Sequence, residues 1–323
     1  MPGDAQLLLI DKAAVEQLLL PDDVIAAVRD AFVLHHRREG RVFPVIRESL
    51  ATGGVFGIKA GDVASQGLLG FKAAGFWPSN RQAGGEAHQA TVLLFDPATG
   101  RPQCVIDGNA ITTARTAAAG ALGLQLLARP DSRRVTVFGT GIQGAAQLAY
   151  ALRTLPGLAH VAYVTSDRRR DAAFEARFAQ RCDIRCAADA DAAVATSDIV
   201  ITATPGAGPL FDAAAVRPGT HLNCVGADTR GKRELPAGVL ERACVVVDDH
   251  AQAMALGELQ WAPHTPCREL GELVATAASR ARDADDITVF DMTGLALQDL
   301  TVAELIHRGA RQRGLGTAVA WPW

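Results

Sequence analysis

The sequence predicts an α/β protein in which a smaller α+β domain precedes a doubly wound parallel sheet of the Rossmann type. In the second part of the chain, short apolar runs alternate with helix-like segments, as in a parallel sheet whose strands are joined by helices. The first of these runs leads directly into a glycine-rich turn. In the first part, the apolar runs are broken by glycines and a turn signal, which is typical of antiparallel strands.

We place the boundary between these domains where a long helix ends and the alternation begins. The first part contains a helix over 21–40, strands over 55–59, 69–73 and 90–95, a hairpin turn over 96–100 and a helix over 112–128. Arg129-Pro130-Asp131 interrupts that last helix, so we predict one domain at 1–130 and a second at 131–300. The strands expected in the second domain are 135–138, 161–164, 199–202, 221–225, 244–247 and 287–290.

The glycine-rich turn has the order of residues that a dinucleotide requires. A β-branched strand enters Gly139-Thr140-Gly141-Ile142-Gln143-Gly144, and a helix of small residues follows. Gly139 permits the tight turn, Gly141 lets the backbone approach the pyrophosphate, and Gly144 lets the helix pack close to the strand. The helix N-terminus then offers N–H groups to the phosphates. We therefore predict that these six residues bind NAD or NADP.

The choice between the two dinucleotides depends on the end of the next strand. Asp167 follows that strand and suits the free ribose hydroxyls of NAD. Ser166, Arg168 and the two arginines after it suit the 2′-phosphate of NADP, although arginines here also fit a solvated start of a helix. Both cofactors stay open, and we favour NADP.

Composition and charge exclude several classes of partner. The chain of 323 residues is 49% hydrophobic and 21% charged, with a formal net charge of −3, so we expect neither a nucleic acid nor a membrane as partner. The N-terminus has no signal-peptide pattern, and no apolar run approaches about 20 residues, so we expect a cytoplasmic protein. The six cysteines are scattered without a histidine cluster, which predicts reduced thiols and no metal site.

Several ordered motifs resemble the ornithine cyclodeaminase/mu-crystallin family. These motifs are Arg47, Lys72, the TTARTAA run at 112–118, the glycine turn, GADTRGKREL at 226–235 and FDMTGLALQD at 290–299. The resemblance covers about 41–316. It implies hydride transfer between nicotinamide C4 and the α-carbon of an amino acid or its imine. It also implies a homodimer built by the first domain, which residues 301–323 complete.

The resemblance assigns a substrate site as well. Arg47, Lys72 and Arg115 are expected to hold the substrate carboxylate, while Lys72 and Asp228 are the expected catalytic residues. Guanidinium groups suit this task because they bind a carboxylate bidentately and so orient the reacting carbon. Arg41 competes with Arg47 for its role, and Lys59 competes with Lys72. Further residues expected at the cofactor are Thr113, Thr202, Ala203, Thr204, Val225, Gly226, Gly294 and Leu295. A structural turn is the alternative for 202–205, and close helix packing is an equal alternative for Gly294 and Leu295.

The loop after Lys72 distinguishes between possible substrates. The cyclodeaminase pattern is polar there, whereas this chain continues with the aromatic pair Phe76-Trp77. A distal ammonium needs a polar partner, and the loop supplies no obvious one, so a small amino acid or a cyclic imine fits better. We therefore favour an imine reductase or amino-acid dehydrogenase. Ornithine cyclodeaminase is the alternative, followed by a non-catalytic NADP-dependent binder; contact of Trp77 or His88 with substrate stays open.

Overall fold

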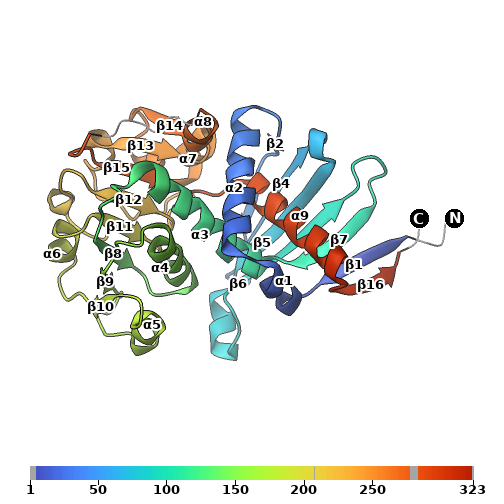
Figure 1. Cartoon of the computed structure of the whole chain (residues 1–323), viewed down its shortest axis with the longest axis horizontal. Coiled ribbons are helices and arrows are strands. Elements are labelled where there is room, and N and C mark those ends of the chain that lie inside the picture. Colours follow the sequence, from blue (N-terminus) through green and yellow to red (C-terminus); the bar gives the residue numbers. More distant parts are fainter. Residues whose placement is uncertain (1–4, 207, 277–282, 322–323) are drawn as a thin grey trace. The chain divides into compact units, whose positions relative to one another are not determined.

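Two separate sheets organise the chain in the computed structural model, which describes residues 5–206, 208–276 and 283–321 (Figure 1). Each sheet belongs to one of two units. Unit 1 comprises Met1–Arg115 and Leu295–Trp323, and unit 2 comprises Thr116–Gly294. None of the described helices is both long and apolar enough to cross a membrane.

Unit 2 contains the parallel sheet that the sequence predicts. Within the described residues its eight strands follow the order β10-β9-β8-β11-β12-β15-β13-β14, and every neighbouring pair is parallel. The strands are β8 (Arg134–Phe138), β9 (His160–Val164), β10 (Asp183–Cys186), β11 (Ile199–Thr202), β12 (His221–Cys224), β13 (Cys244–Val247), β14 (Cys267–Glu269) and β15 (Thr288–Asp291). The order reverses between β8 and β11, the point at which such sheets bind ligands. The predicted fold class is confirmed.

All six strands predicted for this sheet are present, and two more lie at its edges. β10 and β14 occupy the two ends of the strand order and are four and three residues long. Each carries charged residues, such as Arg185 and Arg268, in place of an apolar run. Edge strands need no apolar residues on both faces, which is why the hydrophobic pattern did not reveal them.

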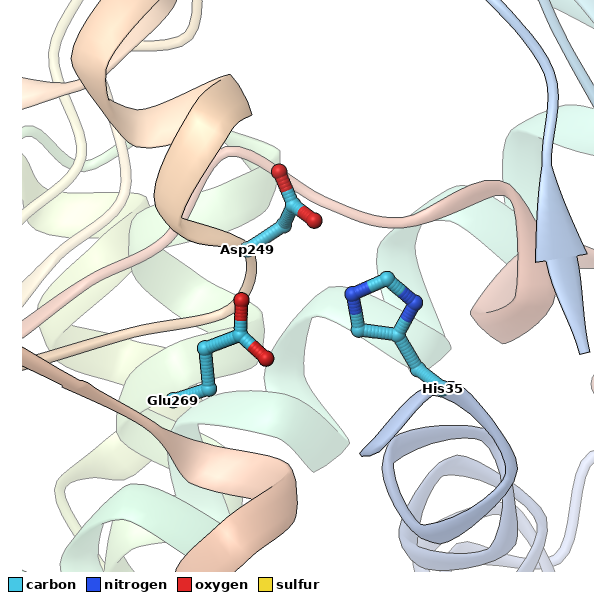
Figure 2. Close-up of side chains that lie close together, drawn as sticks. All are labelled: His35, Asp249 and Glu269. Atoms are coloured by element: carbon cyan, nitrogen blue, oxygen red, sulfur yellow. The ribbon is translucent and has the colours of Figure 1, made fainter. Parts of the chain in front are cut away.

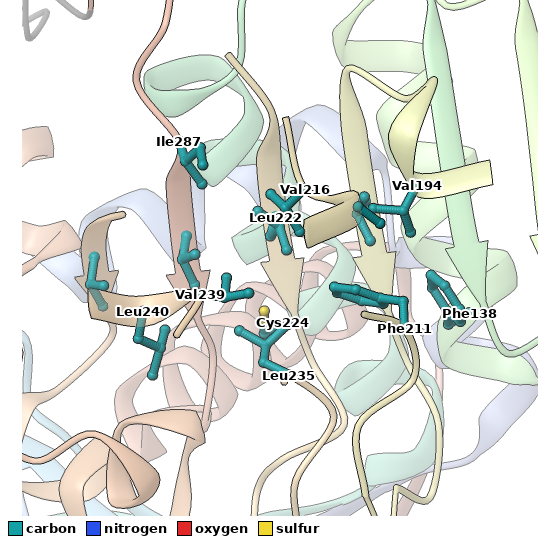
Figure 3. Close-up of a cluster of buried hydrophobic side chains, with 14 of the residues drawn as sticks. Phe138, Val194, Phe211, Val216, Leu222, Cys224, Leu235, Val239, Leu240 and Ile287 are labelled. Carbon is teal, nitrogen blue, oxygen red and sulfur yellow. The ribbon is translucent and has the colours of Figure 1, made fainter. Parts of the chain in front are cut away.

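Helices and short turns cover both faces of the parallel sheet. Its helices are α4 (Ile142–Thr154), α5 (Ala172–Phe178), α6 (Ala190–Ala195), α7 (His250–Leu256), α8 (Leu270–Ala275) and the larger part of α3 (Gly108–Leu127). On one face, Phe138, Leu222 and Phe211 belong to a buried cluster (Figure 3). On the other face, Val137 packs with Leu148 of α4. Burial on both sides explains why these strands are continuous apolar runs.

Unit 1 is built on a mainly antiparallel sheet. Its strand order within the described residues is β16-β1-β7-β6-β5-β4-β2, and β3 also pairs with β4. The strands are β1 (Gln6–Ile10), β2 (Arg41–Val42), β3 (Ile46–Ser49), β4 (Val55–Val63), β5 (Leu68–Phe76), β6 (His88–Phe95), β7 (Pro102–Asp107) and β16 (Thr317–Ala320). β6 and β7 form the predicted hairpin, and only β1 and β7 among these pairs run parallel.

One face of this sheet is covered by α9 (Ala296–Arg313), which packs on β4, β5 and β6. The helix α2 (Pro21–His36) packs on α9, and α1 (Lys12–Leu18) contacts the same helix. The buried residues of α9 include Leu297, Leu300 and Ile306. A helix from the C-terminal part of the chain therefore completes the core of the first unit.

The limits of the units differ from the domain boundaries expected from the sequence. The expected boundaries were 130/131 and 300/301, whereas the units divide at 115/116 and 294/295. α3 is continuous across the first division. Its later residue Leu124 packs with Val135 and Leu148 in the core of unit 2, which is why most of this helix belongs to unit 2. The contacts therefore divide the chain within α3, before the Arg129-Pro130-Asp131 segment.

Candidate cofactor and substrate sites

The glycine turn of unit 2 follows β8 and has three structurally distinct positions. Gly139 has a positive φ of +94°, and a Cβ added there would lie 2.6 Å from the Ala203 carbonyl oxygen. A Cβ on Gly144 would lie 1.9 Å from the Gly139 carbonyl oxygen, so only glycine lets α4 pass this close to the turn. A Cβ on Gly141 would meet no atom within 4 Å. Gly141 thus faces open space, where a ligand can approach the backbone.

The helix α4 begins at this open position without a side-chain cap. Gly141 is its N-cap residue, and no side chain accepts hydrogen bonds from the first turn. Ile142 and Gln143 form that turn, and Thr140 precedes it. Uncapped N–H groups at a helix N-terminus form an anion site, because they point along the positive end of the helix dipole. These residues fit a dinucleotide pyrophosphate.

The loop after β9 is exposed and rich in charge. Arg168 has a left-handed backbone, with φ of +56°, and its Nη1 donates to the Ala188 carbonyl oxygen at 2.6 Å. The Asp167 carboxylate accepts from the Arg169 backbone N–H at 3.1 Å, and this bond lowers the pKa of Asp167. Arg170 is paired with Glu175 at 2.6 Å. Ser166 lies in the same exposed loop, so these predicted cofactor residues do lie together.

Glu234 joins the carboxyl ends of β11 and β12 through hydrogen bonds to three of the predicted cofactor residues. Its buried carboxylate accepts from the Thr202 hydroxyl at 2.7 Å, from Thr204 N–H and Oγ1–H at 2.8 and 2.7 Å, and from Gly226 N–H at 2.8 Å. The Thr202 and Thr204 hydroxyls are therefore used within the protein. Glu234 was not predicted, although the GKREL motif contains it.

A second buried carboxylate, Asp248, holds the end of unit 2. It accepts from the backbone N–H groups of Thr293 and Gly294 and from the Thr293 hydroxyl at 2.7 Å. Gly294 has φ of +81°, which glycine adopts without strain. The predicted residue Gly294 is thus fixed by its neighbours, while Leu295 is fully buried at the start of α9 in unit 1.

Two further carboxylates lie at the start of α7 (Figure 2). Asp249 caps the helix by accepting from Gln252 N–H at 2.7 Å, and Glu269 accepts from His250 N–H at 3.1 Å. The capping roles account for both acids in unit 2. Figure 2 also draws His35, which belongs to α2 of unit 1.

Asp228, the predicted catalytic acid of unit 2, follows β12 and is partly exposed. Its Oδ1 accepts from Lys232 Nζ at 2.7 Å and from the Thr229 hydroxyl at 3.0 Å. Val225 and Gly226 lie between the strand and this residue. Asp228 therefore lies just beyond the carboxyl end of a parallel strand, where ligands of such sheets bind.

In unit 1, three charged side chains form a buried cluster, which we name the clamp: Lys72 of β5, Arg115 of α3 and Asp299 of α9. Asp299 Oδ1 lies 2.7 Å from Lys72 Nζ and 3.0 Å from Arg115 Nε. Lys72 Nζ also donates to the Thr112 hydroxyl at 3.3 Å, and Arg115 Nη1 donates to Gln298 Oε1 at 3.1 Å. The structure thus brings together two of the three predicted carboxylate-binding residues.

Burial shifts the ionisation of the clamp. Loss of water around Lys72 lowers its pKa to about 7, although Asp299 opposes the shift; Arg115 adds to it. Burial raises the pKa of Asp299, but the Lys72 and Arg115 charges outweigh this and hold it below the ordinary value. A lysine with a pKa near neutrality can give or take a proton at physiological pH.

The remaining predicted residues of unit 1 lie on neighbouring elements. Arg47 is half-buried on β3. Its competitor Arg41 is exposed and binds both Asp62 oxygens, at 2.7 and 2.6 Å. Lys59 faces Lys72 in the β4–β5 register. Thr113 donates its hydroxyl to the Asn109 carbonyl oxygen at 3.0 Å.

The aromatic pair after Lys72 is packed into unit 1. Cβ atoms added to Gly54 and Gly75 would lie 2.5 and 2.6 Å from the Trp77 ring, so both glycines make room for the indole. The Arg81 guanidinium lies 5.7 Å from the centre of the Phe76 ring.

The clamp contains one residue that sequence reasoning missed. Asp299 stands in the FDMTGLALQD motif that carries the family resemblance, yet no role was assigned to it. The available signal was an acid in the first turn of a helix, with Leu297 and Leu300 close to it in sequence. Buried acids of this kind are rare unless they are paired.

Comparison with known proteins identifies the family of this chain. Residues 6–314 match the ornithine cyclodeaminase/mu-crystallin family. The chain belongs to this family. The iminosuccinate reductase of Paracoccus denitrificans is 32% identical, over 97% of this chain and 99% of that protein. Family membership, expected from the sequence motifs, is confirmed.

Two solved structures of the family are similar along nearly the whole chain. The archaeal alanine dehydrogenase dimer with bound NAD has a TM-score of 0.90 and 29% identity, with 98% of this chain and 99% of that chain covered. The Δ1-pyrroline-2-carboxylate reductase of Thermococcus litoralis, with NADH and L-proline, has a TM-score of 0.88 and 26% identity, covering 97% and 100%. The expectation of an enzyme of the imine reductase and amino-acid dehydrogenase class is confirmed.

Proposed function

We propose that this family member reduces the C=N bond of a small imino acid, or oxidises the matching amino acid, with a nicotinamide dinucleotide. The observation that carries the proposal is the clamp, in which Lys72 and Arg115 share one oxygen of Asp299. Two cations around one carboxylate leave one positive charge, and the carboxylate of an imino acid neutralises it. Arg47, from the neighbouring β3, is the third proposed contact to that carboxylate.

Each polar residue then has a definite task. Arg115 and Arg47 orient the carboxylate and so fix the α-carbon beside it. Lys72, with its pKa of about 7, binds the carboxylate as an ammonium and donates a proton to the substrate nitrogen. Asp228 is the proposed partner of the protonated nitrogen and the base when the amino acid is oxidised. The packed Trp77 limits the substrate to a compact side chain.

The residues at the glycine turn fit the cofactor. Thr140, Gly141, Ile142 and Gln143 would hold the pyrophosphate at the uncapped start of α4, with Gly139 and Gly144 shaping the turn. When bound, the cofactor supplies or accepts the hydride at the α-carbon. The other proposed cofactor residues are Thr113, Ser166, Asp167, Arg168, Thr202, Ala203, Thr204, Val225, Gly226, Gly294 and Leu295. Thr202 would contact the cofactor through its backbone, because its hydroxyl donates a hydrogen bond to Glu234.

We propose NADP as the preferred cofactor. Arg168 and Arg169 are exposed at the end of β9, and two guanidinium groups next to the adenosine ribose favour a 2′-phosphate. The Asp167 carboxylate opposes this preference, so the selectivity for NADP is expected to be modest.

We further propose that the protein is a cytoplasmic homodimer. The related alanine dehydrogenase was solved as a dimer. The six cysteines form no disulfide within the described residues, which fits a reducing compartment.

A direct assay tests the proposal. The purified protein is incubated with NADPH or NADH and with Δ1-pyrroline-2-carboxylate, Δ1-piperideine-2-carboxylate, iminosuccinate or pyruvate plus ammonia, and absorbance is followed at 340 nm. Oxidation of NADPH or NADH by one of these substrates supports the proposal. If none is reduced while ornithine plus NAD yields proline and ammonia, the protein is a cyclodeaminase. Tight cofactor binding without any turnover indicates a binder.

A further inference from the structure

We propose that Asp299 is the positioning residue of the clamp, whose one carboxylate oxygen sets both the orientation of Arg115 and the charge of Lys72. This inference rests on the proposed function, in which the two cations bind the substrate carboxylate. Asp299 acts through them, without a substrate contact of its own.

The geometry supports Asp299 as a shared anchor, which means one carboxylate that binds both cations of the clamp. Asp299 Oδ1 is 2.7 Å from Lys72 Nζ and 3.0 Å from Arg115 Nε, and the exposed side-chain fractions of Lys72, Arg115 and Asp299 are 4%, 10% and 1%. The three residues come from β5, α3 and α9 of the same unit. Buried charges cost desolvation free energy, and apolar residues of similar size often stabilise a fold as well. A cluster of three buried charges is thus better explained by a role in substrate binding than by a contribution to the stability of the fold.

Arg115 is held at two of its nitrogen atoms by Asp299 and its neighbour Gln298. Nε donates to Asp299, and Nη1 donates to Gln298 Oε1 at 3.1 Å. Both acceptors lie in the first turn of α9. Two bonds to adjacent residues determine the plane of the guanidinium, and a bidentate carboxylate contact requires a defined plane. Loss of Asp299 should therefore impair orientation, and with it turnover, more than affinity.

The anchor also determines whether Lys72 is charged. The titratable groups that act on Lys72 are Asp299 of α9, Arg115 of α3 and Lys59 of β4, and His88 of β6 responds to Lys72 in turn. Burial and the two cations lower the pKa of Lys72, whereas Asp299 alone among these raises it. Burial lowers the pKa of His88 to about 4, so His88 is neutral near pH 7. Asp299 is therefore the group among these that favours the ammonium form of Lys72.

The test compares Asp299→Asn with the unmodified enzyme in imine reduction between about pH 5.5 and 9. The unmodified enzyme should lose activity as pH rises through about 7, where Lys72 deprotonates. We call this decline the alkaline limb of the pH profile. Asparagine removes the charge that favours the ammonium, so this limb should move at least about one pH unit lower. We expect kcat to fall at least about tenfold and KM to change less than about threefold, because removing an anion offsets part of the lost alignment.

Two variants separate positioning from folding. Asp299→Glu keeps the charge and should bring the limb back toward that of the unmodified enzyme. Glu304→Gln changes another acid of α9, which is not part of the clamp. Glu304 Oε1 accepts a hydrogen bond from Arg308 Nε at 2.5 Å. This variant should leave kcat and the alkaline limb of the pH profile unchanged. If Asp299→Asn only lowers the melting temperature and retains the original kcat and limb, the proposal is overturned.

A measurement without substrate separates this inference from the proposed function. The Lys72 Cε resonance is titrated by NMR in protein labelled with 13C-lysine, and it is assigned with Lys72→Met. A midpoint that is lower in Asp299→Asn supports the anchor, even if no imine is ever reduced. Equal midpoints in the two proteins would overturn it, even if the imine reductase assay succeeds.

Discussion

The two units present their proposed ligand-binding groups in different ways. In unit 2, the phosphate site consists of backbone: Gly141 leaves space, and α4 begins without a cap. In unit 1, the clamp consists of side chains from three elements, and Lys72 and Asp299 are 227 residues apart in sequence. A backbone site depends on the absence of side-chain atoms, whereas a side-chain site depends on particular charges. Substitutions should therefore affect the two units differently.

The largest effect is expected from removing the ammonium group of Lys72 from the clamp. Lys72→Met has a similar length without the charge, so the substrate loses both a carboxylate contact and a proton donor. We expect kcat/KM to fall by about a thousandfold or more while the dinucleotide still binds. Steady-state rates and fluorescence titration of the cofactor measure these two quantities.

Lys59→Met is the matched control, because Lys59 faces Lys72 across the β4–β5 register. Removing the Lys59 charge should raise the pKa of Lys72, because Lys59 lowers it, and should change kcat/KM by less than about threefold. If Lys59→Met abolishes activity and Lys72→Met does not, the clamp as described is not the substrate site.

A smaller effect is expected at the charged side chain that unit 2 contributes. Asp228→Asn removes the proposed base and partner of the substrate nitrogen, and we expect turnover at least about 100-fold lower with cofactor binding intact. Asp228→Glu retains the charge and should recover part of the activity. Unchanged turnover in Asp228→Asn would remove this residue from the mechanism, leaving Lys232 as its structural partner only.

The difference between a contiguous backbone site and a side-chain site built from distant segments also explains how much of the fold and site the sequence could predict. The strands of the parallel sheet and the glycine turn were found because each is one contiguous segment with its own pattern. Arg115 and Lys72 were found only through family motifs. Asp299 was missed, because nothing local shows that the first turn of α9 packs against β5. The edge strands β10 and β14 were missed for a related reason: their pairing is non-local, and their residues are partly polar.

The glycine turn allows a direct test of the backbone site with two similar variants. Gly141→Ala places a methyl group in open space, so we expect a stability change within about 1 kcal/mol but cofactor binding at least about tenfold weaker. Gly144→Ala places its methyl group 1.9 Å from the Gly139 carbonyl oxygen, so it should lower the melting temperature as well. Calorimetry and cofactor titration distinguish the two. Unchanged cofactor affinity in Gly141→Ala would contradict a phosphate site at this turn.

The smallest effect is expected at the side chains that unit 2 is proposed to offer the cofactor, in the exposed loop after β9. Arg168→Ala removes a guanidinium from the proposed 2′-phosphate site, and exposed charge pairs contribute little, so NADPH should bind about three- to fivefold more weakly and NADH equally well. Arg170→Ala is the control, because Arg170 is held by Glu175 and should not discriminate between the cofactors. If Arg168→Ala weakens NADH and NADPH alike, Arg168 shapes the loop through Ala188 and does not recognise the phosphate. Asp167 would then determine selectivity, and NAD would become the expected cofactor.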